Sequence, residues 1–469
     1  MSDLVFKSAS ELVALLQSGQ VTSVELTQAF LDRIEKFNPS VNSYLFVSSE
    51  SALATAREVD AKRAAGETLP KLAGLPIAVK DNLTTTDAPT TSGSKILEGW
   101  VPQYDATVVS KLRAEMMPIL GKTNLDEFAM GSSNESCAFG VVRNAADTTR
   151  VPGGSSGGSA VAVQADFCQV SLGTDTGGSI RMPAAFCGIS GLKPTYGKVS
   201  RWGLIAYASS FDTIGPMGKF VSDLELVMEV IAGEGGNDST LFETARKYTK
   251  TQKVAYIKEI VEHLSLQPEI KNAFFDRLEQ LKGLGYEVKA VDFPYLEQLL
   301  PTYYVLTTAE SSSNLSRFDG IRFGHRTKEK VDDLADMYKL SRTEGFGEEV
   351  QRRIMLGTFV LSADYYDAYY TKAQKVRRLI QDKTLAILGA YDFIISPTTS
   401  STAYKVGEKT ADPIQMYLGD LFTVQANITG LPAVSVPMGL DSKGLPMGFQ
   451  VTGRAYDEYN MLDFTNLIQ

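Results

Sequence analysis

Two clusters of glycine and serine constrain the fold of this chain more than any other feature. They are GGSSGGS at residues 153–159 and TDTGGS at residues 174–179. Glycine loses more conformational freedom on folding than any other residue, so its density here indicates unusual backbone dihedrals or close approach of the backbone to something. Hydrophobic residues make up 43% of the chain and charged residues 22%, as in ordinary globular proteins. The clusters therefore belong to a folded structure rather than to a flexible tether.

Two common functions of such clusters, phosphate binding and a nucleophile elbow, agree poorly with this sequence. A phosphate-binding loop needs GxxxxGK[ST], or GxGxxG after a strand, and neither pattern occurs. Residues 153–157 match the GxSxG pattern of a nucleophile elbow, whose serine needs a histidine. The chain has only two histidines: His263 on an apparent amphipathic helix with no acid placed to orient it, and His325 in a basic segment. A Ser-His-Asp triad is therefore disfavoured.

A neutral lysine can also activate a serine, directly or through a second hydroxyl. Lys80 ends the apolar run GLPIAVK, which predicts a strand that carries the lysine stem into the interior. Its pKa would have to fall by roughly three units from about 10.4, and burial can cause such a shift. Taken alone, the residues also allow a structural interpretation, in which Lys80 forms a salt bridge with the adjacent Asp81.

The charge balance and the cysteines limit the possible partners and location. The net charge is −9 and the sequence pI is about 5.1, without a long basic block. A protein that grips nucleic acid through phosphates normally has a basic face, so another subunit would hold any nucleic acid. Three cysteines without CxxC spacing favour a reduced, cytoplasmic location. We expect neither a signal peptide nor a membrane-spanning segment.

The pattern along the chain predicts a single α/β domain over residues 1–469. Residues 1–65 indicate helices, the first opened by the capping box Ser8–Glu11, and the second opened by the capping box Thr22–Glu25 and ended by Asn38-Pro39. Short apolar runs from Leu72 onward predict a largely buried sheet. Residues from about 223 to 390 are more charged and predict a mainly helical insertion. The strand-like runs after it, such as LPAVSVPMGL, are expected to rejoin the same sheet.

Three motifs together resemble the amidase signature family: GLPIAVKDN, GGSSGGSA and GTDTGGSIRMPAAFCGISGLKPTYG. They occur in the order and spacing of that family, and the resemblance covers nearly the whole chain. It implies an α/β fold with a large mixed β-sheet covered by helices on both faces. It also implies amide hydrolysis by a serine–cis-serine–lysine triad, in which Lys80 is the base, Ser155 the bridging residue and Ser179 the nucleophile.

The same resemblance implies roles for the residues around the two serines. It implies a cis peptide bond between Gly154 and Ser155. It also implies an oxyanion hole formed by the backbone amides that precede the nucleophile, those of Thr176, Gly177 and Gly178, with that of Ser179.

Four polar neighbours of the triad are expected to support the site without reacting. Asp175 and Arg181 flank the nucleophile, and we expect them to hold its loop by hydrogen bonds or an ion pair. Ser156 and Ser159 are expected to stabilise the turn of the first cluster. No metal site is expected in the chain.

Longer segments, among them NLDEFAMGSSNES and MYLGDLFTVQANITGLPAVSVP, are similar to one branch of the family. This branch contains the glutamine-hydrolysing A subunits of bacterial tRNA-dependent amidotransferases. The similarity implies a heterotrimer that also contains a B and a C subunit, in which the B subunit uses ATP and magnesium and receives the ammonia. The ammonia would convert Glu-tRNA(Gln), Asp-tRNA(Asn) or both. This chain would bind no cofactor of its own.

Glutamine as substrate requires a cation for its carboxylate and an anion for its ammonium group. The resemblance to this branch assigns these roles to Arg353 and Asp420, with Tyr304 lining the same pocket. Arg352 and Arg353 are about 100° apart on a helix, so only one can face the pocket, and we expect it to be Arg353. Tyr303 is the alternative to Tyr304, and Asp420 could instead cap the helix that follows it.

Two other functions remain open from the sequence. One is a stand-alone amidase of the same family that acts on a small or aryl amide. The other is a non-catalytic binding subunit. The pair formed by Arg353 and Asp420 favours glutamine over a small amide, and the intact triad of Lys80, Ser155 and Ser179 argues against a binding role without catalytic activity.

Overall fold

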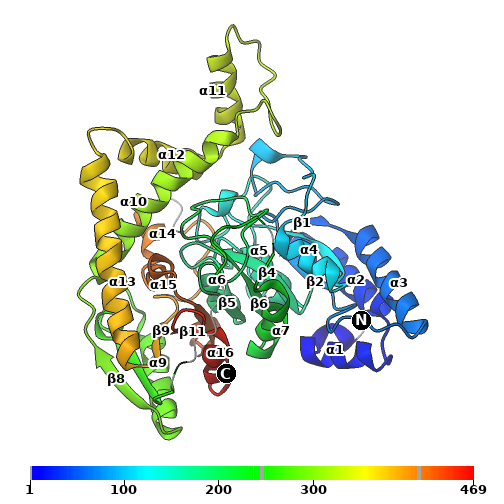
Figure 1. The fold of residues 1–469 in the computed structure, drawn as a ribbon, viewed down its shortest axis with the longest axis horizontal. Helices are drawn as coiled ribbons and strands as arrows, with labels where there is room; N and C mark the ends of the chain where they lie inside the picture. The colour runs from blue at the N-terminus through cyan, green and yellow to red at the C-terminus, as the bar shows by residue number, and fades with distance from the viewer. Residues whose placement is uncertain (1–2, 236, 243–247, 249, 409–412) are drawn as a thin grey trace.

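A mixed β-sheet of eleven strands runs through the molecule (Figure 1). The structure is a computed structural model that describes residues 3–235, 237–242, 248, 250–408 and 413–469. In spatial order the strands are β1 (Tyr44–Val47), β3 (Ile119–Thr123), β2 (Ile77–Lys80), β4 (Val170–Asp175), β6 (Thr213–Gly218), β5 (Ser190–Lys193), β10 (Ala433–Leu440), β11 (Pro446–Thr452), β9 (Phe393–Pro397), β7 (Lys253–Ile257) and β8 (Glu287–Val291).

Both strand directions occur in this sheet. β2 is parallel to both of its neighbours, β3 and β4, and β7 is parallel to β8 and β9. The central strands from β4 to β9 pair antiparallel. Strands from early and late parts of the chain meet where β5 pairs with β10, so the C-terminal strands rejoin the sheet as the sequence predicts.

Three helices form one end of the molecule (Figure 1). They are α1 (Ala9–Gln17), α2 (Ser23–Val41) and α3 (Ser49–Ala64), and both expected capping boxes, opened by Ser8 and Thr22, are present. The predicted end of α2 at Asn38-Pro39 is wrong, because the helix continues to Val41 and ends at Asn42 in the left-handed region. Strand β1 also lies between α2 and α3, so the first 65 residues are not all helical.

Further helices cover the sheet, and the large mixed sheet with its helices confirms the predicted fold class. Helices α5 and α6 pack on its central strands, as do α7, α9 and α16. The helices after α3 are α4 (Thr107–Ala114), α5 (Gly157–Gln164), α6 (Arg181–Cys187), α7 (Val221–Ile231), α8 (Lys258–Val261), α9 (Pro268–Gly283), α10 (Leu296–Asn314), α11 (Leu334–Gly345), α12 (Glu348–Val360), α13 (Lys372–Ala390), α14 (Pro413–Leu418), α15 (Val424–Thr429) and α16 (Glu458–Asn466). Short 3₁₀ helices span Asp3–Phe6, Lys95–Leu97, Glu127–Ala129 and Leu315–Arg317, and a π-helical turn, Asp367–Thr371, leads into α13.

The segment from 223 to 390 is not purely helical. It contributes β7 and β8, which extend the sheet beyond β9. Its long helices α10, α12 and α13 pack together at the end of the molecule opposite α1, α2 and α3, and α11 projects outward beside them (Figure 1). Within the described ranges, no helix combines the length and apolar character needed to cross a membrane.

Candidate active site

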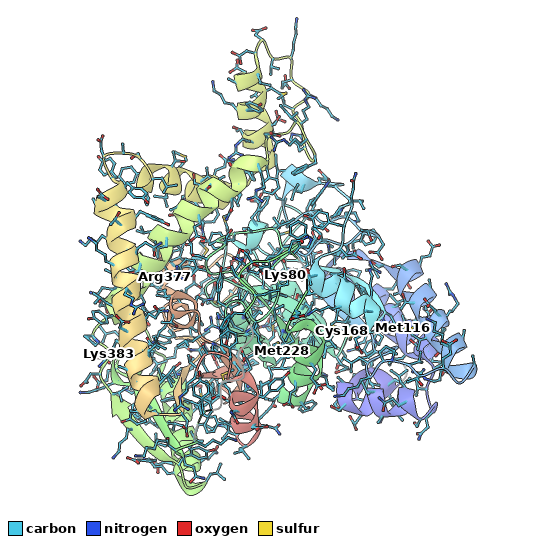
Figure 2. All side chains as sticks on the ribbon, viewed as in Figure 1. Lys80, Met116, Cys168, Met228, Arg377 and Lys383 are labelled. Carbon is cyan, nitrogen blue, oxygen red and sulfur yellow. The ribbon has the colours of Figure 1, made fainter. Side chains whose placement is uncertain are left out.

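Lys80 is the last residue of β2, and its side chain is fully buried near the middle of the molecule (Figure 2). Its Nζ lies 2.8 Å from Ser155 Oγ, 2.9 Å from Ser156 Oγ and 2.8 Å from Thr174 Oγ1. The proposed salt bridge to Asp81 is absent, since that carboxylate pairs with Lys122 at 3.3 Å. The apolar strand thus delivers the amine to three hydroxyl groups.

Ser155 lies in the first glycine-serine cluster, just before α5. Its peptide bond with Gly154 is cis, as the family resemblance implies. A Cβ atom on Gly154 would lie 2.0 Å from Asp126 Oδ2, so no larger residue fits there. Ser156 donates its Oγ hydrogen to the carbonyl of Thr174 and accepts from Lys80, which agrees with the expected supporting role.

Ser179 lies on the turn between β4 and α6 and is 7% exposed. The amide of Ser156 donates to the carbonyl of Ser179 at 3.1 Å, so the two glycine-serine clusters lie against each other. Gly178 has φ +131°, a conformation that side chains rarely adopt. The turn therefore presents Ser179 beside the cluster that carries Ser155.

Arg181 anchors the turn between β4 and α6 that carries Ser179, here called the nucleophile turn. Its guanidinium forms a bidentate ion pair with Asp175, at 3.1 Å from Nε and 3.0 Å from Nη2. It also bonds Thr423 O, Asn427 Oδ1 and Gln450 Oε1. Both charged residues are fully buried and anchor the turn, as expected.

One oxyanion-hole donor implied by the family resemblance is engaged elsewhere. The amide of Gly178 donates to Asp175 Oδ1 at 2.9 Å, so it holds the turn, contrary to the expected role. Among the residues that the structure describes, the amides of Thr176, Gly177 and Ser179 have no hydrogen-bond acceptor. These three amides remain available to a substrate oxygen.

Arg353 and Asp420 lie in one site with Tyr304, as predicted. The Tyr304 hydroxyl donates to Asp420 Oδ2 at 2.7 Å, so the Asp420 side chain does not cap α15. The guanidinium carbon of Arg353 lies 5.4 Å from the centre of the Tyr304 ring, and 5.5 Å from those of Tyr207 and Tyr417. Stacked rings around a guanidinium favour its charged form.

Arg352 and Tyr303 are the alternatives to Arg353 and Tyr304. Arg353 is 3% exposed, whereas the side chain of Arg352 is 34% exposed and pairs with Glu348 and Glu349 on its own helix. Arg353 is thus the inward-facing arginine. Tyr303 is also buried, and a Cβ atom added to Gly177 would lie 2.4 Å from its hydroxyl, so both tyrosines face this region.

Comparison with known proteins agrees with this geometry. The family described as Amidase matches residues 25–462. This chain belongs to the amidase family. Relatives named as the A subunit of glutamyl-tRNA(Gln) amidotransferase include one from Koribacter versatilis, 49% identical over 97% of this chain and 96% of the relative. Another, from Thioalkalivibrio sulfidiphilus, is 50% identical over 99% and 96%.

Solved structures extend the comparison to the fold. The amidase aligns with the A subunit of the Thermotoga maritima glutamyl-tRNA(Gln) amidotransferase with a TM-score of 0.81 and 40% identity, covering 98% of this chain and 94% of the other. A peptide amidase from Stenotrophomonas maltophilia aligns with a TM-score of 0.84 at 29% identity, covering 98% and 96%.

Burial sets the electrostatics of this amidase. It lowers the pKa of Lys80 to about 7, although the carboxylates of Asp126, Asp175 and Asp212 act in the opposite direction. Burial also raises the pKa of Asp420 to about 7, against the hydrogen bond from Tyr304. A large fraction of Lys80 is therefore neutral near pH 7, as a general base requires.

Neither histidine of the amidase contacts Ser155 or Ser179 as a base would. His263 bonds Ser265 through Nδ1 at 2.7 Å, and His325 bonds Glu344 through Nε2 at 2.6 Å. Both contacts lie on the exposed surface. In the part of the chain that the structure describes, no cluster of histidine, cysteine and carboxylate side chains could hold a metal ion. The lysine-based interpretation of the site is the one that the geometry supports.

Three residues of the site were missed from the sequence. Thr174 contacts Lys80, the Tyr207 hydroxyl accepts from Arg353 Nη1 at 2.9 Å, and Asp212 accepts from the Thr176 hydroxyl at 2.6 Å. All of these contacts join distant segments, and no local spacing signals them. The apolar run that contains Tyr207 and Asp212 indicates only a strand.

Proposed function

We propose that this amidase is the glutamine-hydrolysing A subunit of a heterotrimeric tRNA-dependent amidotransferase. The observation that carries the proposal is the pair formed by Arg353 and Asp420 beside the nucleophile turn. Glutamine is a zwitterion, so its carboxylate needs a cation and its ammonium group an anion. The similarity to relatives named as this subunit, which extends over nearly the full length of both chains, supports the same function.

Lys80 acts as the base through Ser155. A neutral amine has two hydrogens and one lone pair. Ser156 donates its own hydrogen to Thr174 O and must therefore accept from Lys80. With Thr174 Oγ1 as the second acceptor, the lone pair faces Ser155, whose hydroxyl hydrogen moves to the lysine.

Acylation then follows by proton transfer between the two serines. Ser155 Oγ takes the proton of Ser179 Oγ as the latter attacks the side-chain amide carbon of glutamine. The amides of Gly177 and Ser179 donate to the developing oxyanion, each contributing roughly 3 kcal/mol. When the C–N bond breaks, Ser155 returns a proton to the leaving nitrogen. Ammonia leaves, and a glutamyl ester remains on Ser179.

Hydrolysis of the ester restores the enzyme. A water molecule loses a proton to the same Ser155–Lys80 relay and attacks the ester carbon. Ser179 regains its hydrogen as the C–O bond breaks, and glutamate leaves. The water and the amide nitrogen occupy the same side of the acyl group in turn, so one relay serves both steps.

The remaining steps belong to the proposed partners. The B subunit uses ATP and magnesium to activate the side-chain carboxylate of Glu-tRNA(Gln) or Asp-tRNA(Asn), and the ammonia displaces the activated group. The C subunit stabilises the pair of larger subunits. The acidic charge of this chain is compatible with tRNA binding by another subunit, and a cytoplasmic location is part of the proposal.

Trapping of the acyl-enzyme tests the proposal. The chain is co-expressed with its partners and treated with 6-diazo-5-oxo-L-norleucine, a reactive glutamine analogue, and the adduct is located by peptide mass. We expect one adduct, on Ser179, and none in Ser179→Ala. An adduct on any other residue contradicts the mechanism. Rapid turnover of unrelated small amides by the chain alone would favour a stand-alone amidase instead.

A further inference from the structure

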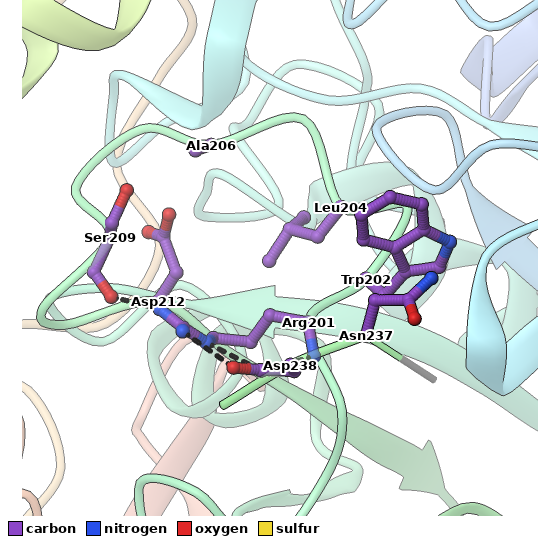
Figure 3. Close-up of a pocket in the computed structure, with 8 residues that line it drawn as sticks. All are labelled: Arg201, Trp202, Leu204, Ala206, Ser209, Asp212, Asn237 and Asp238. Atoms are coloured by element: carbon purple, nitrogen blue, oxygen red, sulfur yellow. Dashed lines mark hydrogen bonds and ion pairs between the residues drawn. The ribbon is translucent and has the colours of Figure 1, made fainter. Parts of the chain in front are cut away.

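Asp212 is a buried carboxylate that the mechanism above does not use. It directly precedes β6 and is 3% exposed, at the side of a surface cavity of about 190 Å³ (Figure 3). A second carboxylate of the same cavity, Asp238, pairs with Arg201 through two guanidinium nitrogens. Asp212 instead directs its oxygens to the backbone and side chains around the active site.

The sheet register places Asp212 opposite the nucleophile turn. In the antiparallel pair of β4 and β6, Asp175 is aligned with Thr213. One step beyond this pair, Thr176 and Asp212 face each other, and the Thr176 hydroxyl donates to Asp212 Oδ1 at 2.6 Å. Thr176 is three residues before Ser179, and its amide is among those available to a substrate oxygen.

The other contacts of Asp212 lead to the opposite side of the substrate site. Its Oδ2 accepts from the amides of Tyr207 and Ala208, at 3.0 and 3.1 Å. The Tyr207 hydroxyl accepts from Arg353 Nη1 at 2.9 Å and donates to Thr307 Oγ1 at 2.9 Å. One carboxylate thus contacts both the nucleophile turn and the segment that orients the arginine.

We propose that Asp212 is a positioning residue that holds the nucleophile turn, through Thr176, in register with Arg353, through Tyr207. The inference rests on the proposed function, because Arg353 has the assigned role only if the substrate carries a carboxylate. Asp212 does not touch the substrate. Its two groups of contacts control different parameters: Thr176 affects the chemical step, and Tyr207 affects substrate binding.

Single variants that leave Asp212 in place test each connection separately. Thr176→Val replaces only the hydroxyl with a methyl group, and we expect kcat for glutamine to fall about tenfold with little change in KM, as for loss of one buried hydrogen bond to a carboxyl group. Tyr207→Phe removes the hydrogen bond from Arg353 but keeps the ring beside the guanidinium, and we expect KM to rise about tenfold with little change in kcat. If these two contacts were purely structural, the activity of each variant would fall only in proportion to the amount of folded protein that is lost.

Variants of Asp212 itself complete the test. Asp212→Ala should lower kcat and raise KM together. Asp212→Asn should stay within about threefold of the wild type, because its carbonyl oxygen can accept from the two amides while its NH₂ group donates to Thr176. The matched control is Asp238→Asn, a change in the other carboxylate of the cavity, which should leave both parameters unchanged.

A double-mutant cycle measures whether Thr176 acts through Asp212. The loss in kcat for Asp212→Ala combined with Thr176→Val should not exceed that of Asp212→Ala alone. Losses that multiply would show independent effects and overturn the inference, as would Asp212→Asn behaving like Asp212→Ala. All assays use the complex with its partners. A wild-type complex without glutaminase activity would contradict the proposed function instead.

Discussion

The Nζ atom of Lys80 lies 2.8 Å from the Oγ atom of Ser155, and both side chains are completely buried. Burial favours the neutral amine and so creates a base without a histidine. The same burial keeps water away from the amine, so its proton exchanges mainly with the hydroxyl groups that surround it. The strand that ends at Lys80 is thus part of the chemistry as well as of the sheet.

Lys80→Arg and Lys80→Met should each lower kcat for glutamine by about 10²–10⁴-fold, the usual contribution of a general base. Arginine keeps the positive charge at neutral pH and cannot accept a proton, whereas methionine keeps the bulk without the amine. Steady-state ammonia release measures the effect, and thermal unfolding shows whether the variants fold. Turnover close to wild type in a folded Lys80→Arg variant would contradict the assigned role of the lysine.

Activity should rise with pH through about 7. The pKa values of Lys80 and Asp420 are both about 7, and the reaction needs the lysine deprotonated and the aspartate ionised. Both requirements are lost as the pH falls, so the plot of log kcat/KM against pH should approach a slope of 2 on the acid side. In Asp420→Asn the lysine is the one of these two groups that still titrates, and the slope should approach 1. A profile that falls between pH 6 and 8 would contradict a neutral lysine base.

Arg353 and Arg352 provide a matched pair for testing carboxylate recognition. Arg353→Lys removes the planar guanidinium from the ring of tyrosines and should raise KM for glutamine by about 10–100-fold. Arg352→Lys changes the adjacent, more exposed residue and should alter KM by less than about twofold. Initial rates over a range of glutamine concentrations distinguish the two. Equal effects of both substitutions would place the carboxylate elsewhere.

Asp420 should determine whether the substrate needs an ammonium group. The wild type should prefer glutamine strongly over glutaramic acid, the analogue that lacks the α-amino group. Asp420→Asn should reduce this preference by about tenfold or more, since the neutral amide no longer attracts the ammonium group. Competition between the two substrates measures the ratio of their kcat/KM values. An unchanged ratio would mean that another residue binds the amino group.

Much of the fold was predictable because local signals were strong. The capping boxes of α1 and α2 satisfy the first backbone amides of each helix, and the two residues of each box lie only three positions apart in sequence. The end of α2 was misplaced because Pro39 removes one backbone hydrogen bond in the last turn without ending the helix, which Asn42 terminates. β7 and β8 were missed because each has only five residues and lies in a part of the chain that is mostly helical.

Some residues of the site could likewise be predicted from the sequence, and others could not. Lys80 was identifiable because an apolar strand with one terminal lysine is unusual without pairing or chemistry. Thr174 and Asp212 were not, because their contacts depend on which strands pair and in which register. No spacing in the sequence aligns Asp175 with Thr213, and the contact between Thr176 and Asp212 follows from that alignment. The family resemblance implied the substrate residues, which composition alone does not indicate.

The anchoring of Arg181 has a consequence for the synthesis of the chain. Its partners Thr423, Asn427 and Gln450 leave the ribosome long after the turn that they support. The nucleophile turn therefore lacks its anchor while most of the polypeptide is already made. An unfinished chain from a stalled ribosome contains all three residues of the relay but cannot hold them for reaction, so translation must near completion before glutamine is consumed.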